Sequence, residues 1–159
     1  MIHGFLKACT VSPALRVADC AFNTQQTIAA MQRAALDGAQ LAVFPELGLT
    51  GYTCGDLFFQ QPLQRAAAKG LAAVLEASAG LDLVALVGLP VAVDGKLYNC
   101  AAVVCRGQLL GLVPKSHIPN YGEFYELRHF SPAPAETGVI RLWGQEVPFG
   151  TRLLFRQEE

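Results

Sequence analysis

Two residues of this chain, Glu46 and Lys115, combine opposite charges with a similar local setting. Each follows an apolar run and a proline; the run is Leu41–Phe44 before the glutamate and Leu109–Val113 before the lysine. In α/β proteins, groups that act on a ligand lie just beyond the ends of buried strands. A carboxylate there can act as a general base, and a neighbouring ammonium can stabilise developing negative charge. The spacing alone favours the other reading, a purely structural ion pair at the edge of the sheet.

The elements that would position this pair follow from the apolar pattern. The first part of the chain predicts a strand, a helix and a strand, namely Phe5–Val11, a helix from its N-cap Asp19 to about Asp37, and Leu41–Phe44. Within this helix, Ile28, Met31 and Ala35 share one face and are expected to point inward. A unit of this kind has parallel strands joined by a right-handed crossover.

The middle of the chain predicts a helical segment and then a meander of strands. Residues 57–79 are rich in Ala, Leu and Gln and predict one helix or two, with Pro62 near the start. Three strands follow, Leu83–Val93, Leu97–Cys105 and Leu109–Val113, and the first two are joined by the hairpin signal Asp94-Gly95. The expected fold is therefore one α/β domain over residues 1–159, built on a mixed sheet with flanking helices.

The last part of the chain reads mostly as loop. Residues 116–134 hold four aromatic side chains among acidic and basic ones, which is typical of an ordered functional loop. Val139–Leu142 predicts a short strand, and Val147–Thr151 predicts a turn.

Composition excludes several classes of protein. The 159 residues are 52% hydrophobic and 16% charged with a net charge of −1, which speaks against binding to nucleic acid or to a membrane surface. The N-terminus does not read as a secretory leader, and no apolar run has the length of a membrane span. Five cysteines without CxxC spacing predict free thiols in a cytoplasmic protein and no metal site.

Three short motifs carry a resemblance to a known family. Phe44-Pro45-Glu46, Pro114-Lys115-Ser116-His117 and Gly122-Glu123-Phe124 resemble the carbon–nitrogen hydrolase (nitrilase) superfamily. The longer stretches ELGLTGYTCGDLF, KSHIPNYGEFYELRHF and VPFGTRLLF resemble, within that superfamily, the N-terminal glutaminase domains of glutamine-dependent NAD synthetases. The resemblance runs over essentially the whole chain and implies an enzyme with half of the family's α-β-β-α sandwich, here incomplete.

The resemblance also implies roles for particular residues. Glu46 would be the general base and then the acid, Lys115 would help to form the oxyanion hole, and Glu123 would hold Lys115 in place. Three aromatic side chains would line the glutamine site or lie near the route of ammonia, unless they are ordinary loop anchors: Tyr52, Tyr121 and Phe124.

The family's cysteine nucleophile comes after the lysine, and here the sequence departs from the pattern. The last cysteine is Cys105, before Lys115. Cys54 lies in a segment that matches the synthetases at a position that is not the nucleophile, and the other four cysteines read as core residues. We therefore expect the first part of a glutaminase domain that is inactive alone, with the rest of this domain and the ATP-dependent synthetase domain absent.

The implied reaction is the hydrolysis of glutamine to supply ammonia for the ATP-dependent amidation of deamido-NAD in NAD biosynthesis. This step would need no cofactor, whereas ATP and Mg²⁺ would belong to the synthetase domain. Glutamine, that domain and further copies of the chain in a homo-oligomer are the expected partners. Two alternatives remain open, a fragment of a stand-alone amidase or carbamoylase and a truncated, non-catalytic paralogue that acts as an interaction module.

Overall fold

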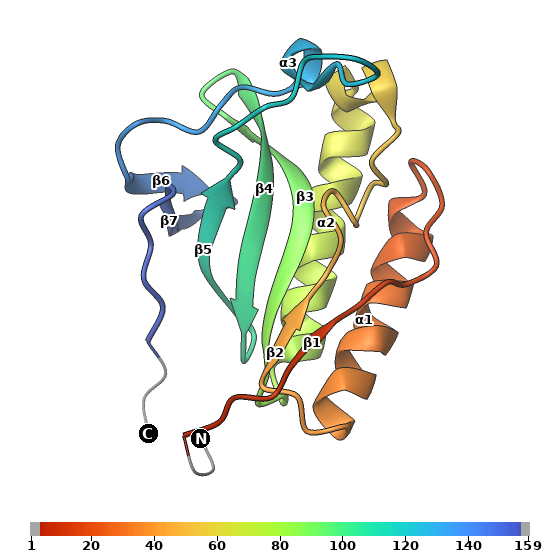
Figure 1. The fold of residues 1–159 in the computed structure, drawn as a ribbon, viewed down its shortest axis with the longest axis vertical. Helices are drawn as coiled ribbons and strands as arrows, with labels where there is room; N and C mark the ends of the chain where they lie inside the picture. Colours follow the sequence, from red (N-terminus) through yellow and green to blue (C-terminus); the bar gives the residue numbers. More distant parts are fainter. Residues whose placement is uncertain (1–3, 157–159) are drawn as a thin grey trace.

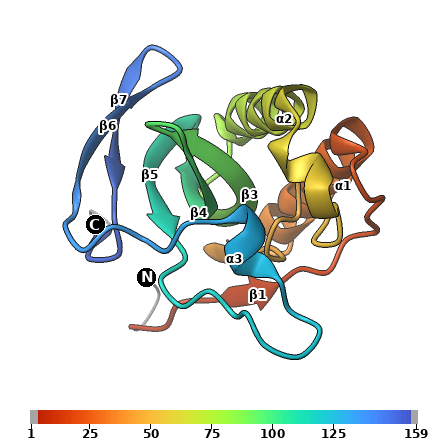
Figure 2. The ribbon, with the colours of Figure 1, turned by 90° about the horizontal axis from the view of Figure 1, so that it is seen from above.

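A single mixed sheet runs through the molecule, and two long helices cover one of its faces (Figures 1 and 2). The computed structural model describes residues 4–156. In these residues the sheet has seven strands in the spatial order β1-β2-β3-β4-β5-β7-β6. Their bounds are β1 Ala8–Thr10, β2 Leu41–Val43, β3 Val84–Val93, β4 Lys96–Cys105, β5 Gln108–Pro114, β6 Gly138–Leu142 and β7 Gln145–Phe149. The prediction of a mixed sheet is confirmed.

The first strand–helix–strand unit forms as predicted, with parallel pairing of β1 with β2 and of β2 with β3. The helix α1, Cys20–Leu36, begins after Asp19, whose side chain accepts a hydrogen bond from the Phe22 amide at 3.0 Å. Strand β1 is shorter than the predicted Phe5–Val11, and Phe5 itself is exposed.

The buried face of α1 differs in part from the prediction. Met31 is buried, but Ile28 and Ala35 are only partly so. The fully covered positions are Cys20, Asn23, Thr24, Thr27, Met31 and Ala34. Polar residues occupy this face because neighbouring backbone satisfies them, for example Asn23 through the carbonyls of Arg16 and Leu49.

The helical segment after β2 divides into two pieces, as one reading of the sequence allowed. A short 3₁₀ helix η1, Gly55–Phe59, precedes the α-helix α2, Gln61–Ser78. Pro62 occupies the first turn of α2, where its missing N–H costs no hydrogen bond. Helices α1 and α2 pack side by side against the sheet (Figure 1), and their apolar side chains form the core with alternate residues of β3 and β4.

The turn predicted at 147–151 is wrong for its first residues, which belong to strand β7. Strands β6 and β7 form an antiparallel hairpin, and Phe149 of β7 pairs with Leu112 of β5, which joins the hairpin to the sheet. Its tight turn is Trp143-Gly144, with φ of 51° and 83°. Left-handed backbone at both positions is the geometry of a two-residue hairpin turn, although tryptophan is an uncommon residue there.

The loop at 116–134 is ordered and contains one helical turn, α3, Glu126–His129. It crosses the upper end of the sheet, above the ends of β3 and β5 (Figures 1 and 2). Within the described part of the chain, no helix is long and apolar enough to cross a membrane.

Candidate active site

Glu46 and Lys115 lie at the same edge of the sheet, beyond the ends of β2 and β5. Strands β3 and β4 separate β2 from β5, so three strand spacings of about 4.8 Å place them about 14 Å apart. The side chains nevertheless meet, since Lys115 Nζ donates to Glu46 Oε1 at 2.7 Å. The predicted neighbourhood of these two residues is therefore present, and it depends on how each chain leaves its strand.

Asn99 of β4 joins the two residues. Its side-chain amide donates a short hydrogen bond to Glu46 Oε1, and its backbone carbonyl accepts from the Lys115 amide at 2.8 Å. The sequence reading did not select Asn99. A signal was available, because an amide side chain inside the apolar strand LYNCAAVVC must find a polar partner.

The two oxygens of Glu46 differ as a result. Oε1 accepts from both Lys115 and Asn99, whereas no residue of the described chain donates to Oε2. The side chain is 42% exposed. One oxygen is thus fixed by the protein, and the other is left available to exchange a proton with a bound molecule.

The second carboxylate at Lys115 comes from Glu126 rather than from Glu123. Lys115 Nζ lies 3.0 and 2.9 Å from the two oxygens of Glu126, whose side chain is only 7% exposed. Glu123 is exposed, and no hydrogen bond or ion pair joins it to another described residue. Glu126 therefore takes the place that the sequence reading gave to Glu123.

A sequence signal for Glu126 also existed. Glu126 and Phe130 are four residues apart, so one helical turn directs both to the same side, and both are buried. Glu123 lies before this helical turn, directly after Gly122 with its left-handed φ of 59°, and it is exposed.

The carboxylates keep Lys115 charged. Burial lowers the pKa of Lys115, but the hydrogen bonds to Glu46 and Glu126 outweigh it, and the pKa is raised overall. A lysine held as an ammonium between two carboxylates can stabilise negative charge that develops nearby, but it cannot act as a base at neutral pH.

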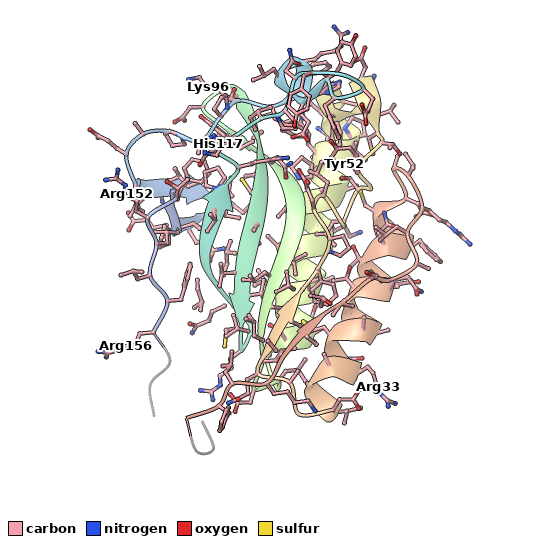
Figure 3. The ribbon with its side chains drawn as sticks, in the orientation of Figure 1. Arg33, Tyr52, Lys96, His117, Arg152 and Arg156 are labelled. Carbon is pink, nitrogen blue, oxygen red and sulfur yellow. The ribbon has the colours of Figure 1, made fainter. Side chains whose placement is uncertain are left out.

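The hydrogen bonds among Glu46, Asn99, Lys115 and Glu126 form a polar network, and Tyr52 joins it from the loop after β2. Its hydroxyl donates to Glu126 Oε1 at 2.6 Å. Burial and the hydrogen bond to Glu126 raise the pKa of Tyr52 above its usual range. Tyr52 lies at the same end of the sheet as His117 (Figure 3).

The other two predicted aromatic residues lie beside the network. Tyr121 is 72% exposed and lines an open cavity of about 540 Å³ together with Lys115, His117 and Leu127. Phe124 is half-buried, and its ring meets that of Tyr121 edge-on at a centroid distance of 5.8 Å. The cavity next to Lys115 has room for a small polar substrate.

Helix α3, which carries Glu126, is fastened to η1. Arg128 donates to both oxygens of Asp56, at 2.7 and 2.8 Å, and His129 Nε2 lies 3.1 Å from Asp56 Oδ1. The rings of Phe58 and Phe59 contact the His129 ring at centroid distances of 5.7 and 5.3 Å. Hydrogen bonds from Arg128 and His129 hold the pKa of Asp56 well below its usual range.

None of the five cysteines has the setting of an activated thiol next to Glu46. Cys54 is buried, and its thiol faces the carbonyls of Thr50 and Gly51. Burial raises the pKa of Cys54, of Cys100 and, to about 11, of Cys20. Cys105 lies at the far end of β4, and Cys9 lies within β1. A reactive thiol requires a lowered pKa.

These features match an established family. The carbon–nitrogen hydrolase family model matches residues 7–154, and the chain belongs to that family. It is 41% identical over 153 residues, 96% of its length, to the glutamine-dependent NAD(+) synthetase of Mycobacterium tuberculosis and 32% identical over 146 residues to that of Rattus norvegicus. The chain matches the N-terminal part of these synthetases and spans about a fifth of their length, 22% and 20%.

Solved structures agree on the fold. A glutamine-dependent NAD(+) synthetase from Cytophaga hutchinsonii superposes with a TM-score of 0.89 at 25% identity and covers 96% of this chain and 26% of its own. The synthetase from Acinetobacter baumannii, in complex with adenosine diphosphate, gives 0.76 at 30% identity, with 90% and 27% covered. The expected nitrilase-type fold, present in part, is confirmed, and the chain is related to the glutaminase domain of these synthetases.

Proposed function

We propose that this chain is the N-terminal part of a glutaminase domain that hydrolyses the side-chain amide of glutamine. Its ammonia would serve the ATP-dependent amidation of deamido-NAD to NAD. The observation that carries the proposal is the ion pair between Glu46 and Lys115, in which one glutamate oxygen is free and Lys115 lines an open cavity. The likeness to glutamine-dependent NAD synthetases over 96% of the chain supports the choice of substrate.

In the proposed reaction, Glu46 moves the protons. Its free oxygen Oε2 accepts the proton of an attacking cysteine thiol, while Asn99 and Lys115 fix Oε1. The thiolate attacks the amide carbon of glutamine, and the charge of Lys115 stabilises the oxyanion. Glu46 then returns the proton to the departing ammonia and activates the water that hydrolyses the thioester.

The nucleophile of this reaction is not one of the chain's own thiols. Three of them are buried with raised pKa values, and the other two lie in β1 and at the opposite end of β4. We therefore expect residues 1–159 alone to release no ammonia from glutamine. Release of ammonia by the purified chain, abolished by Glu46→Gln, would contradict this.

The remaining assignments follow from the proposed reaction. The glutaminase step uses no metal or organic cofactor, and we assign no residue of this chain to ATP or Mg²⁺, which belong to a synthetase domain. That domain, glutamine and further copies of the chain in a homo-oligomer are the proposed partners. The five free thiols suit a reducing cytoplasm.

A hybrid enzyme tests the proposal. These residues replace the matching segment of the Mycobacterium tuberculosis synthetase, and NAD formation is measured with glutamine and with ammonia as the nitrogen source. The hybrid should use both, and Glu46→Gln should lose only the use of glutamine. A well-folded hybrid that uses ammonia but not glutamine would refute the function proposed for these residues.

A further inference from the structure

The segment that carries Glu46 turns out of the sheet for a few residues. Strand β2 continues its parallel ladder as far as the Phe44 amide, which donates to the Leu86 carbonyl at 3.0 Å. In a regular parallel ladder, residue 46 would donate next, to residue 88. Instead the Leu49 amide donates to the Gly88 carbonyl at 3.1 Å. Residues 45–48 therefore stand out of the ladder, and Glu46 is at their centre.

This segment is a tight turn. The Gly48 amide donates to the Pro45 carbonyl at 3.1 Å, and the Thr50 and Gly51 amides both donate to the Leu47 carbonyl. Leu47 has a φ of 51°, a left-handed conformation that a leucine adopts only when its surroundings hold it there. The Leu47 side chain is almost fully buried, which supplies part of that constraint.

The turn rests on Gly88 of β3. A Cβ on Gly88 would lie in severe overlap with the Pro45 carbonyl oxygen, 2.5 Å from the Leu47 nitrogen and 3.0 Å from the Glu46 carbonyl carbon. All three are backbone atoms, so no side-chain rotation relieves the contact. Gly88 has no left-handed φ, and its lack of a side chain is therefore needed for space rather than for conformation.

The contact matters because Glu46 has to reach β4 and β5 from β2. Gly88 lies on β3, the first of the two strands that it must pass, opposite Ala101 of β4. By strand alternation, the neighbours Val87 and Leu89 point to the helix-side core, so Gly88 faces the other side of the sheet. The turn lies directly on that strand, which brings the carboxylate within 2.7 Å of Lys115 and within hydrogen-bond distance of Asn99.

We infer that Gly88 is a positioning residue for the proton carrier Glu46, and that its bare Cα sets the distance between Glu46 and Lys115. This inference rests on the proposed function, because Glu46 is the proton carrier there. A methyl group at position 88 has to move the turn by about 1 Å to reach ordinary contact with the Leu47 nitrogen. A displacement of that size lengthens the Glu46–Lys115 contact beyond hydrogen-bond distance.

The test measures the ion pair itself in the 159-residue chain. Gly88→Ala is compared with Gly138→Ala, a second strand glycine whose Cβ would meet nothing within 4 Å. Carbon-13 NMR follows the titration of the Lys115 side chain, and circular dichroism verifies folding. Gly88→Ala should lower the pKa of Lys115 towards its ordinary value, whereas Gly138→Ala should leave it unchanged. A folded Gly88→Ala chain with an unchanged pKa of Lys115 would overturn the inference.

A gentler variant covers the case in which Gly88→Ala does not fold. Gly48→Ala perturbs the same turn from within, because its Cβ would lie 3.0 Å from the Pro45 oxygen and meet no atom of β3. It should shift the pKa of Lys115 in the same direction by less. An unchanged pKa of Lys115 in this variant would show that the position of the turn does not set the distance between Glu46 and Lys115, and that would overturn the inference.

In the hybrid enzyme, Gly88→Ala should lower the rate with glutamine about 100-fold, the effect of a misplacement of about 1 Å, and leave the rate with ammonia unchanged. Equal losses with both nitrogen sources would show a merely structural role. The NMR result does not depend on glutamine, so a failure of the proposed function would leave it standing.

Discussion

Replacing Glu126 by glutamine removes one negative charge from the site and keeps the shape of the side chain. Glu126 accepts hydrogen bonds from the Lys115 ammonium, at 2.9 and 3.0 Å, and from the Tyr52 hydroxyl, at 2.6 Å. A neutral amide offers one acceptor oxygen, and its NH₂ group then faces a donor. The variant therefore leaves Lys115 with Glu46 as its one remaining carboxylate partner among the described residues.

The expected loss of stability follows from burial. Glu126 is 7% exposed and Lys115 29% exposed, so water replaces the lost contact poorly. Breaking a buried ion pair costs about 3–5 kcal/mol, and the partner kept by Lys115 places this variant at about 3 kcal/mol. For a domain of this size, that corresponds to a fall in melting temperature of about 6–12 °C.

The assay combines thermal unfolding with two titrations. Glu126→Gln should lower the pKa values of both Lys115 and Tyr52 towards their ordinary values, because the carboxylate that raises them is gone. The matched control is Glu123→Gln, three residues away on the exposed side of the same loop, with an expected change in stability within about 0.5 kcal/mol. Equal effects of the two variants, or a larger effect of Glu123→Gln, would refute the placement of Glu126 on Lys115.

Two further predictions concern pH and the fastening of α3. Tyr52 and Lys115 bind their protons more tightly in the folded than in the unfolded chain, so the stability that they supply is complete below about pH 10 and is lost as the pH rises further. The melting temperature should fall as the pH rises above about 10, less steeply in Tyr52→Phe, and with an unchanged slope in the exposed control Tyr125→Phe. Asp56→Asn should speed hydrogen exchange at the amides of residues 128 and 130, which close the α3 turn, because its side chain no longer accepts both Arg128 bonds, and unchanged exchange would contradict that role. Asp82→Asn, which breaks another exposed aspartate–arginine pair, should leave exchange in α3 unchanged.

The sequence was informative wherever the physical cause is local. Alternating and continuous apolar runs predicted the strands of the meander, and Asp94-Gly95 predicted its hairpin, where both residues have left-handed φ. Asp19 was correctly expected to cap α1. The Trp143-Gly144 turn was not predicted, because a bulky residue rarely occupies a left-handed position. For the same reason strand β7, which follows this turn, was not predicted either.

Side-chain partners were harder to predict than strands. Glu46 and Lys115 were selected because each follows a strand and a proline, which is a local feature of the sequence. Glu123 and Glu126 differ by three residues in one loop, and only the direction of one helical turn decides which of them reaches Lys115. Composition cannot distinguish two glutamates that share the same neighbourhood.

The sequence by itself thus determined most of the elements, their order and the two charged residues at the strand ends. The tertiary structure alone decided the network that joins them. Asn99 and Glu46 are 53 positions apart, Lys115 and Glu46 are 69 apart, and Tyr52 and Glu126 are 74 apart. The space that Gly88 leaves for the Glu46 turn is likewise a contact between residues far apart in the sequence. Such contacts depend on which strands become neighbours and on which face each residue occupies, and those are properties of the assembled sheet rather than of any local run of residues.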